Sequence, residues 1–198
     1  MGAKKLEISA KELEIYDSLL ALVQDATRKC FAQFSDHPAK IVAPIPDSVD
    51  INFDHWVCAI NIKLDMASID VKLHYSSGVA RLLASKRFNI PAKSIPNKVL
   101  GDFIQEYLNL VMGQVKKKIG SADISVMVPE TSPTRDMEDP RFEVLDRNSA
   151  SWQLSWPDQS FFFSCMVKLE QELAEIDLQK LKTTDKVDED DSGEMELF

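Results

Sequence analysis

Apolar residues recur every three or four positions in two long stretches of the chain, and this period predicts two long amphipathic helices. The first covers "ISAKELEIYDSLLALVQDATRKCFAQF", in which Ser9 and Glu12 have the spacing of a capping box. The second runs from about Lys98 to about Ile119 and is followed by Gly120, a residue type that commonly closes helices. A shorter helix is predicted between them in "SGVARLLASKRFNI".

Alternation of apolar and polar residues with a period of two predicts the strands. "HWVCAINIKLD" and "SIDVKLHYS" have this alternation, as expected for an antiparallel hairpin with one buried face. We expect a short edge strand in "AKIVAP", a connection in "PETSPTRDMEDP", and four further strands in "ADISVMV", "FEVLDR", "WQLSW" and "SFFFSCMVKL". Helices and strands are segregated along the chain, so the predicted fold class is α+β, with a mixed, mainly antiparallel sheet and the long helices packed on one face.

The length and charge of the chain predict one domain and one acidic segment. A chain of 198 residues with 44% hydrophobic residues can supply a single core, and we place that domain at residues 1–182. Residues 183–198 are predicted to be a disordered tail, because the last fourteen residues hold seven acids and one lysine. The terminal "EMELF" is alternatively a short docking peptide for a partner.

The sequence lacks the residues that several classes of function need. The net charge of -9 comes without the basic stripe that contacts phosphates, so no nucleic acid is expected as a partner. The three cysteines are far apart and lie beside apolar residues, which is typical of buried reduced thiols in a cytoplasmic protein. The histidines show no ligand spacing, so we expect no metal site and no cofactor bound by this chain. No apolar stretch approaches the length of a membrane span, so no membrane is expected either.

The polar face of the predicted 98–119 helix is the strongest candidate for a functional surface. When residues are placed about 100° apart, five of them fall in one sector opposite the apolar stripe: Asp102, Glu106, Asn109, Gly113 and Lys116. Glycine inside a helix costs about 1 kcal/mol relative to alanine, and like charges four residues apart also weaken a helix. A glycine here removes a side chain where another molecule can approach closely, so this face is predicted to be a contact surface.

The stretch "EYLNLVMGQVK" is similar to the E-x-x-N-x-x-x-G-x-x-K motif of CheX-type proteins, within the CheC, CheX and FliY family of phosphatases that act on phosphorylated CheY. Glu106, Asn109, Gly113 and Lys116 match this motif by position. The order of predicted elements agrees with the family over roughly residues 10–168. The first helix has no second E-x-x-N, so the resemblance implies one active site per chain, as in CheX.

What the resemblance implies is hydrolysis of the aspartyl phosphate of CheY or a related receiver domain. Asn109 would orient the attacking water and Glu106 would pair with the receiver's lysine, while Asp102, Gly113 and Lys116 would contact the partner. The Mg²⁺ ion of the reaction would sit on the receiver. The resemblance also suggests a homodimer with a continuous sheet. The alternative is a CheX-like adaptor without catalysis, which sequesters a phosphorylated receiver or contacts other signalling machinery.

Overall fold

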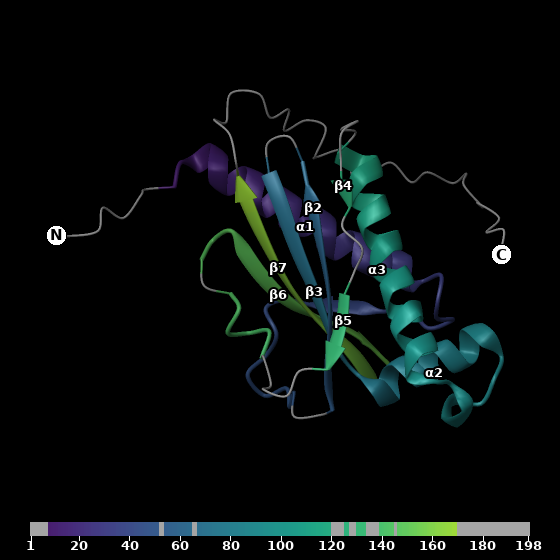
Figure 1. The fold of residues 1–198 in the computed structure, drawn as a ribbon. Helices are drawn as coiled ribbons and strands as arrows, with labels where there is room; N and C mark the ends of the chain where they lie inside the picture. The colour runs from purple at the N-terminus through teal and green to yellow at the C-terminus, as the bar shows by residue number, and fades with distance from the viewer. Residues whose placement is uncertain are drawn as a thin grey trace.

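A computed structural model describes residues 8–51, 54–64, 67–119, 125–126, 130–133, 139–144 and 146–169 of the chain. These residues form two layers, with a seven-stranded sheet on one side and two long helices on the other (Figure 1). The predicted α+β class with long helices on one sheet face is therefore confirmed. The predicted tail 183–198 lies outside the described residues.

The sheet is antiparallel at every strand pair that the described residues form. Its strand order is β1-β6-β7-β3-β2-β4, and β5 also pairs with β2. The strands are β1 (Lys40–Val42), β2 (His55–Lys63), β3 (Ala67–Ser76), β4 (Ser125–Val126), β5 (Glu130–Pro133), β6 (Ser149–Trp156) and β7 (Gln159–Leu169). The predicted hairpin is β2 with β3, and the predicted edge strand is β1.

The helices begin and end where the sequence signals place them. Helix α1 (Ala10–Phe31) has the predicted capping box, with both hydrogen bonds between Ser9 and Glu12 present. Helix α2 (Ser77–Phe88) ends at Asn89, whose φ of 54° is the left-handed conformation typical of a helix end. A single 3-10 turn, η1 (Ala92–Ser94), then leads to α3 (Asn97–Ile119). None of the helices in the described ranges has the length and apolar character needed to cross a bilayer.

The main core lies between the sheet and the two long helices. Both helices and the inner sheet face contribute to one cluster of buried apolar side chains. From the strands, this cluster takes Cys58, Ile60, Ile62, Ala67, Ile69, Val71, Leu73, Tyr75, Trp152, Leu154, Phe161, Phe163, Cys165 and Val167. Tyr107 ties the helices together, because its hydroxyl donates to the carbonyl oxygen of Thr27 at 2.8 Å.

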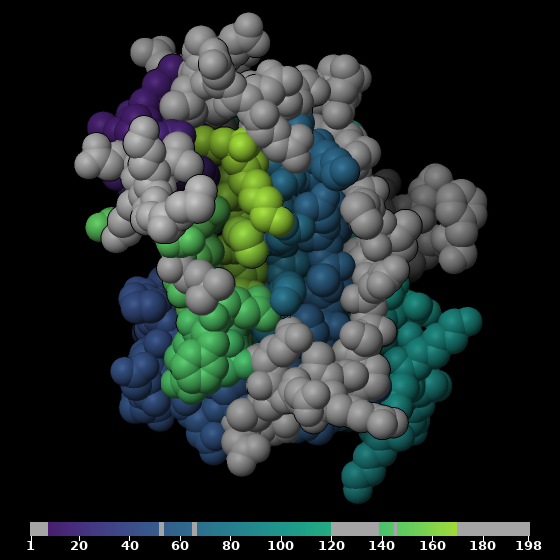
Figure 2. Space-filling view, turned by 60° about the vertical axis from the view of Figure 1, so that its left-hand side comes forward, coloured from purple at the N-terminus to yellow at the C-terminus, as the bar shows by residue number. Residues whose placement is uncertain are grey.

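The other sheet face is covered in part by loops, and it buries polar side chains as well as apolar ones. Figure 2 shows β7 in yellow-green and the β2–β3 hairpin in blue side by side at the surface. Here His74 is fully buried although the sequence pattern placed it on the polar side of β3. Its Nδ1 lies 2.9 Å from His55 Nε2, and its Nε2 lies 3.2 Å from Ser164 Oγ.

Glu143 completes this polar network from the 139–144 segment. Its carboxylate accepts hydrogen bonds from Ser164 Oγ and from Lys72 Nζ. An ionised carboxylate only accepts, so Ser164 must donate to it and accept from His74 Nε2–H. His74 Nδ1 is then left to accept from His55 Nε2–H. The network therefore has a single direction of donation, which ends at Glu143.

Two strand predictions were wrong. The segment "FEVLDR" forms turns in its described residues, because Arg141 bonds Asp139 and three carbonyls of residues 46–49 while Glu143 points inward to Ser164. These bonds hold the segment across the sheet, and Phe142 is left 78% exposed. Conversely, the sequence predicts a connection at Glu130–Pro133, but these residues form β5, because they pair with the edge of β2. Such pairing depends on tertiary context more than on local propensity.

The polar network should contribute measurably to stability. We expect Ser164→Ala to lower the free energy of unfolding by about 1–3 kcal/mol, because it leaves the buried His74 and the half-buried Glu143 without their hydroxyl partner. Urea denaturation followed by tryptophan fluorescence measures this change. Ser155→Ala is the control, because the Ser155 hydroxyl makes only a long 3.5 Å bond to the Lys40 carbonyl oxygen. An equal loss in both variants would contradict the network.

Candidate functional site

Helix α3 presents all five predicted site residues to solvent. Its apolar residues are buried against the sheet and α1, including Leu100, Ile104, Leu108, Val111 and Val115. On the opposite side, the structure places the following residues in the exposed class: Asp102, Glu106, Asn109, Gly113 and Lys116. The helical wheel therefore predicted the direction of these side chains correctly, and the structure brings all five onto one surface.

Glu106 and Asn109 stand one helical turn apart on this surface. They are separated by about 4.5 Å along the axis and about 60° around it, so both side chains leave the same side of α3. Among the described residues, no hydrogen bond or ion pair engages either side chain. A carboxylate and an amide in this position can bind groups that a partner brings.

Gly113 leaves the backbone of α3 open between the directions of Glu106 and Asn109. A Cβ atom built at this position would meet no heavy atom within 4 Å. The glycine is therefore not required by packing against the described residues. Since it lowers helix stability without a packing reason, a contact with another molecule is the function that fits it best.

Contacts at its start and middle hold α3 in place. Arg81 on α2 donates to the Ile95 carbonyl oxygen and to the side-chain oxygen of Asn97, the first residue of α3. Farther along, Phe103 makes edge contacts with Phe34 and Phe88 at ring-centroid distances of 5.4 and 5.9 Å. The candidate residues therefore lie on a rigid element rather than on a loop, which suits groups that must be held in register.

The charges of the surface are ordered along the helix axis. Asp102 lies in the second turn of α3, whereas Lys116, Lys117 and Lys118 lie in its last turn. Acids near the start of a helix and bases near its end both interact favourably with the helix dipole. The surface is thus acidic around Glu106 and basic beyond Gly113.

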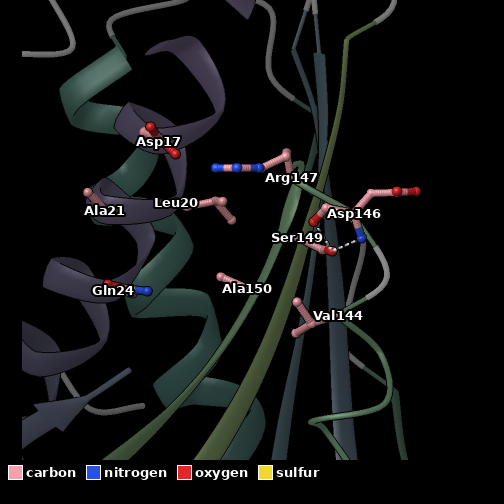
Figure 3. A pocket seen from close by; sticks show the side chains of 9 residues that line it. All are labelled: Asp17, Leu20, Ala21, Gln24, Val144, Asp146, Arg147, Ser149 and Ala150. Carbon is pink, nitrogen blue, oxygen red and sulfur yellow. Dashed lines mark hydrogen bonds between the residues drawn. The ribbon is translucent and has the colours of Figure 1, made fainter. Parts of the chain in front are cut away.

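Two further features lie outside this surface. In the part of the chain that the structure describes, no group of three or more histidine, cysteine or acidic side chains could hold a metal ion. A hollow of about 650 Å³ lies between α1 and the start of β6, and Arg147 points across it toward α1 (Figure 3). Its lining residues include none of the five on α3: Asp17, Leu20, Ala21, Gln24, Val144, Asp146, Arg147, Ser149 and Ala150.

The contact between His55 and His74 was not predicted from the sequence. The two residues are nineteen apart in the chain and show no ligand spacing, but the antiparallel register of β2 and β3 brings them together on the outer sheet face. The signal that could have revealed this contact is the register of the hairpin: Val57 pairs with His74 and His55 with Ser76. The pair belongs to the buried network and not to the surface of α3.

No family model and no curated protein matches this sequence, but solved structures with a similar fold do. A CheC-like superfamily protein from Shewanella sp. PV-4 covers 76% of this chain and 97% of its own, with 11% identity and a TM-score of 0.60. CheX from Vibrio vulnificus has the same identity and TM-score and covers 76% and 99%.

A third similar structure is the CheX–CheY–BeF3–Mg complex from Borrelia burgdorferi, with 11% identity, a TM-score of 0.60 and 76% and 97% coverage. The chain has the CheC/CheX-like fold. These structures are matched over nearly their full length and cover about three-quarters of this chain. At such low identity the similarity shows the fold alone. Inferences about function therefore depend on the side chains on α3.

Measurements of the free energy of unfolding can test whether Gly113 faces open space in this CheX-like fold. Gly113→Ala should raise the free energy of unfolding by about 1 kcal/mol, because alanine favours helix and its methyl group meets open space. Urea denaturation provides the measurement. Gly101→Ala is a matched control in the same helix, since a Cβ there also meets nothing within 4 Å, and it should stabilise similarly. A destabilised Gly113→Ala variant would mean that this surface is covered.

Proposed function

We propose that this chain is a phosphatase that hydrolyses the aspartyl phosphate of CheY or a related response-regulator receiver domain. The observation that carries the proposal is the exposed pair Glu106 and Asn109, one turn apart beside the bare backbone of Gly113. The CheX-like fold supports it, because one protein with this fold is in a complex with CheY. We further propose that the chain acts in the cytoplasm and as a homodimer.

Asn109 is the residue that would act on the water molecule. A phosphoryl group on a carboxylate reacts by in-line attack, and catalysis of this step depends mainly on positioning and on electrostatic stabilisation. The amide of Asn109 can accept a hydrogen bond from the water and donate one to a neighbouring oxygen, so it can hold the water without acting as a base. Its exposure on a rigid helix allows it to enter a pocket on the receiver.

Glu106 would set the register of the two proteins. Its carboxylate can form a charge-assisted hydrogen bond with a lysine ammonium on the receiver. Asp102, Gly113 and Lys116 would surround this contact, and the absent side chain at Gly113 would let the receiver approach the helix backbone. The Mg²⁺ ion would be supplied by the receiver as part of the substrate and would offset the phosphoryl charge.

The decisive experiment measures phosphate release from phosphorylated receivers with and without this protein. Asn109→Ala should reduce the accelerated rate by about 100-fold, because the water loses its orientation. Glu106→Gln should mainly raise KM, since a neutral amide pairs less strongly with an ammonium group. Gly113→Leu should also raise KM by filling the open position, even where the variant remains folded.

Gln114→Ala is the matched control, because Gln114 is exposed on α3 but points away from the Glu106 and Asn109 sector. It should leave kcat and KM unchanged. If the wild-type protein fails to accelerate phosphate loss from every cognate receiver, the enzymatic proposal is wrong. Capture of the phosphorylated receiver without acceleration would instead identify the non-catalytic adaptor.

A further inference from the structure

The segment from α2 to the start of α3 has a charge opposite to that of the rest of the chain. Residues 76–101 contain no aspartate or glutamate and hold five basic residues: Arg81, Lys86, Arg87, Lys93 and Lys98. The whole chain has a net charge of -9, so a segment of +5 leaves -14 on the remaining residues. A negatively charged partner is therefore attracted to this segment and repelled by the net charge elsewhere.

Four of these cations are available to a partner. In the residues that the structure describes, Lys86, Arg87, Lys93 and Lys98 are exposed and form no ion pair. The dipole of α2 explains two of them, because Lys86 and Arg87 lie in its last turn, where cations are favourable. Lys98 lies in the first turn of α3, where the dipole disfavours a cation. An interaction with another molecule is the role that fits it best.

Two large apolar side chains lie among these cations. Phe88 and Ile90 are 44% and 39% exposed. The backbone of Ile90 is fixed, because its amide donates to the Ser85 carbonyl oxygen at 3.3 Å and its carbonyl oxygen accepts from Ser85 Oγ at 2.6 Å. Exposed apolar side chains rimmed by charged ones are typical of protein interaction sites. The four cations, Phe88 and Ile90 are called the basic corner.

The basic corner adjoins the candidate site, since α2 lies beside the start of α3 (Figure 1). The ring of Phe88 contacts Phe103 at a centroid distance of 5.9 Å. Glu106 follows Phe103 by one turn, about 4.5 Å along the axis and about 60° around it. Lys98 lies in the same angular sector as Asn109, about 16 Å before it along α3. The corner and the candidate site therefore form one continuous surface.

A specific complex needs more surface than the polar face of α3 provides. A stable interface buries about 800 Å² on each partner, from roughly 20–30 residues. The five candidate residues on α3 supply only a part of this. A receiver domain of about 100 residues has a diameter of about 30 Å. A receiver that places its phosphoryl group at Asn109 therefore also reaches the basic corner.

We propose that the basic corner is a second part of the docking surface for the phosphorylated receiver. The identity of this partner rests on the proposed phosphatase function. The phosphoryl group and the carboxylates that bind Mg²⁺ make the reacting side of a receiver anionic. The cations beside α3 attract that side and set its orientation. Phe88 and Ile90 then stabilise the contact by burying apolar surface against the receiver.

The charges of the corner are tested by receiver binding, without catalysis. The full chain carrying Asn109→Ala is mixed by stopped flow with a cognate receiver activated by beryllofluoride and Mg²⁺. Lys93→Glu with Lys98→Glu should slow association about tenfold at low salt, and about 0.5 M NaCl should remove most of this difference. Lys40→Glu with Arg147→Glu is the matched control. These exposed residues lie in β1 and just before β6, across the sheet from the strands that α3 contacts, so the same change in charge should have little effect.

The apolar part of the corner is tested by Ile90→Ser. This change should weaken equilibrium binding of the activated receiver about tenfold, mainly through faster dissociation. Since Ile90 lies beyond the end of α2 and is exposed, the variant should unfold at the same urea concentration as the wild type. Val42→Ser is the control, because Val42 is 37% exposed but lies on β1, and it should leave binding unchanged. In turnover assays, the corner variants should raise KM and leave kcat as it is.

The docking surface and the enzymatic function fail separately. Corner variants that bind the activated receiver like the wild type would overturn the docking surface, even if Asn109 proves essential for catalysis. Corner-dependent receiver binding in a chain without phosphatase activity would refute the enzymatic function and leave the docking surface established. A chain that binds no activated receiver would overturn both.

An anionic lipid surface is the other partner that basic and apolar side chains fit. Sedimentation with vesicles of phosphatidylcholine and phosphatidylserine distinguishes it from the receiver. Wild-type protein that stays in the supernatant would support the receiver as the partner. Vesicle binding that is lost in the corner variants, together with unchanged receiver binding, would assign the corner to a membrane and overturn the proposal.

Discussion

Burial of one apolar stripe of α3 is the constraint on which the candidate site depends. Leu100, Ile104, Leu108, Val111 and Val115 lie against the sheet and α1, and this packing fixes the rotation of the helix about its axis. At 3.6 residues per turn, the opposite sector can only face solvent. The acid, the amide and the glycine therefore lie at the surface because the apolar residues on the opposite side of the same helix are buried. Any rotation of α3 that hid them would expose the core.

The two faces of the sheet are stabilised by different interactions. The helix-bearing face is an apolar core with aromatic contacts, such as the stacked rings of Trp152 and Phe163 at 5.2 Å. The other face combines a small apolar cluster around Phe162 with the directed hydrogen bonds from His55 to Glu143. These hydrogen bonds give the side chains of His74 and Ser164 polar partners inside the protein, and they secure the 139–144 segment. This division keeps the polar network away from α3.

The candidate site departs from the local rules that the rest of α3 follows. A glycine within the helix and two acids four residues apart both weaken it, whereas the packed stripe and the hydrogen bond of Tyr107 stabilise it. Residues that weaken a helix in this way are expected at functional sites, where the role of the residue outweighs the lost stability.

Residue patterns by themselves determined the helices, the β2–β3 hairpin, and the outward direction of Glu106, Asn109 and Gly113, because these features follow from short-range periodicity and capping. Only the tertiary structure decided the pairing of β5 with β2, the burial of His74 and the turns around Phe142. These features depend on partners distant in the chain: the β2 edge, Ser164 and the carbonyls of residues 46–49. A local pattern carries no information about such partners, and long-range hydrogen bonds can override the preference of a short segment.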